Sequence, residues 1–143
     1  RVYLSDRNYG GKAYGGRALV HSLVTLGAPL ADSAGAAFRG VAWTNREEPM
    51  EDVRCLAVGA TGTPGDSSGQ LTQNAYSFCI DGGDGSVLDG DGITPTFSST
   101  ALPGAETLVL DGVTHFPWAD VFGGPQFAPE LAEEYRNGKP WYG

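Results

Sequence analysis

The sequence predicts an α/β fold built on a small parallel sheet with flanking helices. Three short apolar runs, rich in β-branched residues, occupy residues 18–26, 53–58 and 107–110, and each stops at or just before a glycine. Runs of this kind are typical of strands buried in a parallel sheet. The segments that connect them are too long for hairpins, so we expect the strands to run parallel with other elements crossing between them.

The first strand follows a glycine-rich region. Residues 1–6 are interpreted as the end of a helix, and a connector rich in glycine follows over residues 9–16. The first strand, residues 18–26, then stops at Gly27-Ala28-Pro29. His21 lies inside this strand without a neighbouring catalytic motif, and we interpret a lone histidine of this kind as structural.

A long polar stretch separates the second strand from the third. Residues 60–88 are rich in Gly, Ser, Thr and Asp, which indicates an irregular insertion, and an apolar island at residues 75–80 is consistent with one additional strand. Residues 65–69, GDSSG, match the G-x-S-x-G pattern of serine hydrolases. A nucleophile elbow requires a strand directly before it and a helix directly after it, whereas Ser67 lies in polar sequence, so we interpret Ser67 as part of a turn.

The clearest helix is predicted over residues 130–136. Pro129 suits the first turn, the acidic residues come early, and Arg136 comes late, as the helix dipole favours. Gly138 and Pro140 then end the helix.

The composition is that of one globular domain. The 143 residues are 41% hydrophobic and 18% charged, and the formal net charge is −8. An acidic chain repels phosphate backbones, so no nucleic-acid partner is expected. No apolar run approaches the roughly 20 residues of a membrane-spanning helix, so no such segment is expected. Cys55 and Cys79 lack metal-binding spacing, and both a disulfide and two free thiols remain open.

Residues 81–95, DGGDGSVLDGDGITP, raise the alternatives of a calcium loop and an acid held for catalysis. An EF-hand loop needs oxygen ligands at alternating positions, but the register from Asp89 reaches Ile93 at the fifth position, and the register from Asp81 reaches Gly83 at the third. The calcium-binding β-helix repeat also fails, because Val87 stands where a carboxylate is required. We therefore expect no metal and interpret the first part of the run as a solvated turn.

Asp91 and His115 are the candidate catalytic residues. Glycines flank Asp91 in GDGITP, and His115 follows the third strand by a short turn, which places its ring at the carboxyl end of the sheet. A carboxylate near one ring nitrogen would keep that nitrogen protonated and make the other a general base. Asp89, two residues away, is a rival for the role of the acid.

Four motifs follow one another along the chain, and their order and spacing are informative: LVTLGAPL at residues 23–30, GDGITP at 90–95, LDGVTH at 110–115 and PWYG at 140–143. Together they resemble the C-terminal half of the α/β-hydrolase superfamily, most closely its lipase- and esterase-like members from plants and algae. The resemblance implies that residues 1–143 are the C-terminal portion of one α/β-hydrolase domain. The sheet would then be incomplete without the N-terminal half of that domain.

The resemblance also implies a function. The family pattern makes Asp91 the acid and His115 the base of a Ser-His-Asp triad that cleaves carboxylic esters, with a hydrophobic ester or lipid as substrate and no cofactor. Residues 1–4 are similar to the helix after the nucleophile elbow, so the serine and the oxyanion-hole donors are expected upstream of residue 1. The alternative is a non-catalytic α/β-hydrolase-fold protein that acts in binding or interaction, because a fold does not determine a function.

Overall fold

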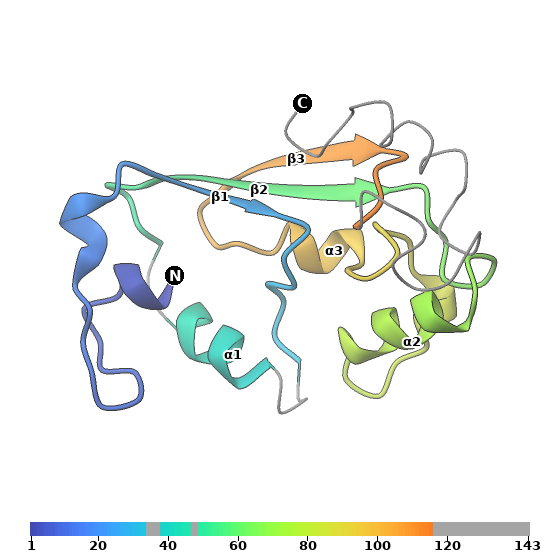
Figure 1. Ribbon diagram of the computed structural model, residues 1–143, viewed down its shortest axis with the longest axis horizontal. Coiled ribbons are helices and arrows are strands. Elements are labelled where there is room, and N and C mark those ends of the chain that lie inside the picture. Colours follow the sequence, from blue (N-terminus) through green and yellow to red (C-terminus); the bar gives the residue numbers. More distant parts are fainter. Residues whose placement is uncertain (34–37, 47–48, 116–143) are drawn as a thin grey trace.

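The computed structural model describes residues 1–33, 38–46 and 49–115. Its centre is a three-stranded parallel sheet in the order β1 (Ser22–Leu26), β2 (Arg54–Thr61), β3 (Glu106–Asp111), with all three carboxyl ends at the same edge (Figure 1). The predicted α/β class and the parallel direction of the strands are confirmed. The predicted helix over 130–136 and the PWYG motif lie outside the described residues.

The central strand, β2, is the most buried because both of its edges are paired. Ala57, Val58 and Ala60 are all buried. The short helix α3 (Thr96–Ser99) lies directly against this strand, since a Cβ on Gly59 would come within 2.5 Å of the Ser99 hydroxyl. Glycine at position 59 therefore lets α3, and the chain just before it, approach the centre of the sheet.

The helices cover one face of the sheet. Figure 1 shows α1 (Arg39–Asn45), α2 (Gln70–Phe78) and α3 on the same side. A small core of Leu30, Ala57 and Leu102 lies between this layer and the strands. On the other face the side chains of Val24 and Leu108 are 55% and 46% exposed within the described structure.

Two predictions for the N-terminal region are wrong. Residues 1–6 contain a single 3-10 turn, η1 (Val2–Leu4), and the first strand begins at residue 22 instead of 18, because residues 16–19 form a second turn, η2 (Gly16–Leu19). The reason is steric. Gly15 adopts φ 58°, and a Cβ on Gly16 would come within 2.1 Å of the Tyr3 ring, so the chain turns here before it can extend.

The insertion contains a helix where an extra strand was predicted. Residues 75–80 belong to α2 and its C-terminal end, and the 3-10 turn η4 (Gly85–Val87) follows. The helical period is visible in burial: Thr72 and Tyr76, four residues apart, are both fully buried. A Cβ on Gly85 would come within 2.1 Å of the Gln73 carbonyl oxygen, so glycine lets η4 pack tightly against α2. The segment is thus a compact unit beside the carboxyl edge of the sheet.

Candidate functional site

The turn that carries Asp91 is attached to the end of the central strand. The Thr96 hydroxyl donates to the Ala60 carbonyl oxygen at 2.5 Å, and the Thr63 amide donates to the Gly90 carbonyl oxygen at 3.3 Å. Residues Gly90 and Pro95 form an antiparallel bridge that closes the turn on itself. The long insertion therefore returns the chain to the sheet edge at which β2 and β3 end.

Each glycine of the GDG motif has its own steric reason. A Cβ on Gly90 would come within 2.3 Å of the Thr94 carbonyl oxygen, because the two sides of the turn approach closely there. Gly92 has φ 97°, a conformation that residues with a side chain rarely adopt. The glycines therefore shape a tight turn and do not make it flexible.

The Asp91 carboxylate is buried and fully engaged. Its side chain is 0% exposed, and Oδ1 accepts hydrogen bonds from the Ile93 and Thr94 amides at 3.0 and 2.6 Å. The Asp91 amide donates in turn to the Thr94 carbonyl oxygen at 3.2 Å. A buried carboxylate needs such partners, because without them its desolvation would be very costly. With Oδ1 held by the backbone, Oδ2 is directed toward the next loop.

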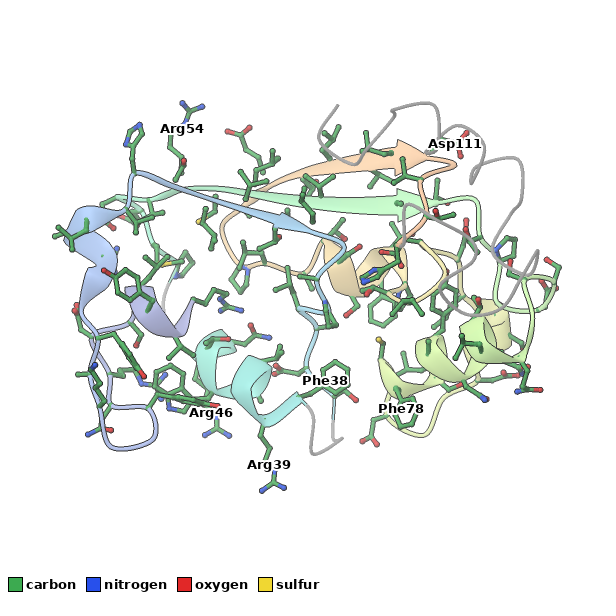
Figure 2. The ribbon with its side chains drawn as sticks, viewed as in Figure 1. Phe38, Arg39, Arg46, Arg54, Phe78 and Asp111 are labelled. Carbon is green, nitrogen blue, oxygen red and sulfur yellow. The ribbon has the colours of Figure 1, made fainter. Side chains whose placement is uncertain are left out.

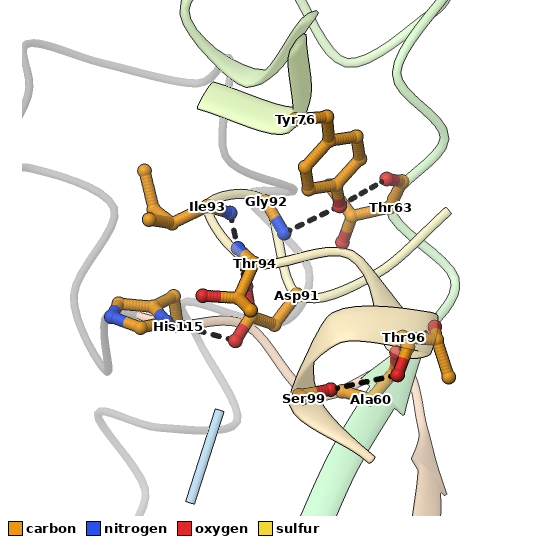
Figure 3. Close-up of polar contacts among 10 residues, drawn as sticks. All are labelled: Ala60, Thr63, Tyr76, Asp91, Gly92, Ile93, Thr94, Thr96, Ser99 and His115. Atoms are coloured by element: carbon orange, nitrogen blue, oxygen red, sulfur yellow. Dashed lines mark hydrogen bonds and ion pairs between the residues drawn. The ribbon is translucent and has the colours of Figure 1, made fainter. Parts of the chain in front are cut away.

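His115 is the residue that Oδ2 meets. The distance from His115 Nδ1 to Asp91 Oδ2 is 2.8 Å, and the His115 amide donates to the Asp91 carbonyl oxygen at 2.7 Å (Figure 3). An ionised carboxylate can only accept, so the neutral imidazole carries its proton on Nδ1 and Nε2 becomes the basic nitrogen. The His115 side chain is 29% exposed, so the ring joins a buried acid to the surface.

Tyr76 supports the turn from the insertion, and sequence reasoning missed it. Its ring is fully buried, its hydroxyl donates to the Thr63 carbonyl oxygen at 2.8 Å, and it accepts from the Gly92 amide at 2.8 Å (Figure 3). Burial raises the pKa of Tyr76 well above its ordinary range, and the nearby Asp91 charge adds to the rise. The phenol therefore stays protonated and ties α2 to the acid-bearing turn. No local sequence signal indicates this role, because Thr72 and Tyr76 are residues that a hydrophobic pattern does not place in a core.

Asp89, the rival acid, points to a different set of partners. It accepts hydrogen bonds from the Thr61 hydroxyl, from the Gly62 amide at 3.0 Å and from the Gly90 amide at 2.8 Å. Burial opposes its ionisation, but these hydrogen bonds outweigh burial and lower the pKa of Asp89. Asp89 therefore fastens the turn to the end of β2, whereas Asp91 meets the histidine.

The other sequence candidates are not members of this hydrogen-bonded pair. Ser67 is exposed in a turn before α2. His21 is exposed at the start of β1. Cys55 and Cys79 both carry free thiols.

The described residues contain neither a metal cluster nor a membrane-spanning helix. Within residues 1–33, 38–46 and 49–115, no cluster of three or more His, Cys, Asp or Glu side chains is arranged to hold a metal ion. The Asp84 carboxylate instead accepts a hydrogen bond from the Ser86 amide at 2.9 Å. The same ranges contain no helix that is long and apolar enough to cross a membrane.

Comparison with protein-family models, with curated proteins and with solved structures found no match to this chain. The geometry of the Asp91–His115 pair and the motifs that contain these two residues are the features that indicate a function.

Proposed function

We propose that this chain supplies the acid and the base of a serine hydrolase that cleaves carboxylic esters. The observation that carries the proposal is the 2.8 Å contact between a fully buried Asp91 carboxylate and the Nδ1 atom of a partly exposed His115. Acid-histidine pairs of this geometry activate a hydroxyl nucleophile in enzymes of several unrelated folds. The location of Asp91 and His115 at the carboxyl ends of parallel strands also supports the proposal, because ligands of open α/β sheets bind at that edge.

The proposed reaction divides the work among three residues. A serine from outside the 143 residues attacks the ester carbonyl, and His115 Nε2 accepts the serine proton as the new bond forms. His115 then gives the proton to the leaving alcohol, and the acyl group stays bound to the serine. Water, activated by His115, attacks this acyl group and releases the carboxylic acid product, and the proton returns to the serine. Asp91 keeps Nδ1 protonated and stabilises the imidazolium that exists between these steps. No cofactor takes part, and the proposed substrate is a hydrophobic ester or lipid.

The test uses the intact protein that contains this chain and its own serine. Asp91→Asn should lower kcat for ester hydrolysis by about 10³–10⁴, because an amide at this position no longer holds the required tautomer. His115→Ala should be at least as damaging, and the double variant should be little worse than His115→Ala, since residues that act as one unit do not add.

Asp89→Asn is the matched control because it is the same chemical change two residues away. It should leave kcat within about tenfold of the wild type, since Asp89 affects His115 only through the position of the turn. Circular dichroism of each variant confirms folding. An intact protein that hydrolyses no ester in any form would favour the alternative, a non-catalytic binding or interaction protein of the same fold.

A further inference from the structure

An apolar groove lies beside the catalytic pair, between the start of α1 and the end of α2. It has a volume of about 280 Å³. Phe38 lines it from the α1 side, and Ala75 and Phe78 line it from α2. Figure 2 shows Phe38 and Phe78 approaching one another from these two helices. Phe78 is 73% exposed, so its side chain is accessible to a ligand in the groove.

The groove lining carries no charge. Apart from Thr94, its side chains belong to apolar residues and to Cys79. Burial raises the pKa of the Cys79 thiol to about 11, and the neighbouring Asp91 charge adds to the rise. The thiol is therefore neutral at ordinary pH, and an ionic ligand would find no partner in this lining.

The groove shares a wall with the site. Ile93 and Thr94 line it, and their amides are the two groups that hold Asp91 Oδ1. Cys79 is a third lining residue on this wall, and the charge of Asp91 contributes to the raised pKa of its thiol. A ligand in the groove thus contacts the same turn that positions His115.

We propose that this groove binds the acyl chain of the ester, with Ala75 and Phe78 as its specificity-determining residues. A long polar or charged group does not fit the lining of the groove. An acyl ester, by contrast, matches the polarity of the Asp91–His115 pair at one end and that of the groove at the other. Its carbonyl end is polar, as is the Asp91–His115 pair, and its chain is apolar, as is the groove. Because the groove is finite, at about 280 Å³, the preference for longer acyl chains should stop where the chain outgrows it.

The experiment measures kcat/KM of the intact protein on para-nitrophenyl esters from acetate to palmitate. We expect an increase of about fourfold for each methylene that the groove buries, and no further increase once the chain is longer than the groove. Ala75→Trp fills the groove, so it should lower the octanoate-to-acetate ratio of kcat/KM by about 100-fold, which corresponds to roughly three buried methylenes. Ala13→Trp, the same change at an exposed position remote from the groove, should leave this ratio unchanged.

Phe78→Ala is the second variant, because an exposed side chain can be truncated with little effect on folding. It should lower the octanoate-to-acetate ratio by about fivefold to tenfold through lost apolar contact. If both Ala75→Trp and Phe78→Ala keep the wild-type ratio, the groove does not bind the acyl chain and the inference is wrong.

The inference rests on the proposed function, so binding is measured separately by titration calorimetry with the neutral ligand 1-octanol. Binding that Ala75→Trp abolishes, in a protein that hydrolyses no ester, would support the groove and refute the hydrolase. Hydrolysis that requires His115, combined with 1-octanol binding that Ala75→Trp leaves intact, would support the hydrolase and refute the groove.

Discussion

Replacing Tyr76 with phenylalanine removes one oxygen atom from the centre of the site. The hydroxyl donates to the Thr63 carbonyl oxygen and accepts from the Gly92 amide, both at 2.8 Å, and the residue is 0% exposed. Phenylalanine keeps the ring and its packing but leaves two backbone groups without this partner. Each buried group that loses its partner costs about 1–3 kcal/mol, so the free energy of unfolding should fall by about 2–6 kcal/mol.

Urea denaturation of the wild type and of Tyr76→Phe, followed by circular dichroism, measures this difference. Tyr14→Phe is the matched control, because the Tyr14 side chain is 44% exposed and water can replace its partners. The control should stay within about 0.5 kcal/mol of the wild type. If Tyr76→Phe also stays within that range, the phenol does not tie the insertion to the acid-bearing turn and our account of the turn is wrong.

Three further predictions concern pH, Asp89 and calcium. The folded state raises the pKa of Tyr76 above its ordinary 10.0, so only the unfolded state loses this proton just above that pH. The free energy of unfolding should therefore fall as pH rises through about 10, and less steeply in Tyr76→Phe, which denaturation from about pH 9 to 11 measures. Asp89→Asn should lower the free energy of unfolding by about 1–3 kcal/mol in urea, because it loses ionic hydrogen bonds to the end of β2. Calcium should leave the melting temperature unchanged. Stabilisation by about 2.7 kcal/mol, expected at 100 times the dissociation constant of a real site, would contradict the conclusion that residues 81–91 do not form a calcium loop.

The strands could be predicted because their signal is local. Each is a short run of apolar and β-branched residues that ends at a glycine or at a turn, and these features together distinguish it from a helix. Helix α2 could not be predicted in the same way, because the residues that it buries include Thr72 and the phenol of Tyr76. Their burial depends on partners such as Thr63 and Gly92, which are distant in sequence.

The choice between Asp89 and Asp91 shows a second limit. Both carboxylates stand in the same acidic, glycine-rich run, and composition does not distinguish them. What separates them is the direction of the backbone, which is set by the close approach at Gly90 and by the φ of 97° at Gly92. These are properties of the folded turn, and only the three-dimensional structure shows that Asp89 faces β2 while Asp91 faces His115.

Asp91 and His115 are joined twice, once through their side chains and once through their backbones. Two tethers between the same residues restrict both sliding and rotation of one against the other. Thermal motion at this edge of the sheet should therefore carry acid and base together as a rigid body. The distance that should fluctuate is the one between the Asp91–His115 pair and a nucleophile or substrate that approaches His115. Loops that carry the nucleophile can consequently vary in length and sequence while the spacing between Asp91 and His115 is preserved.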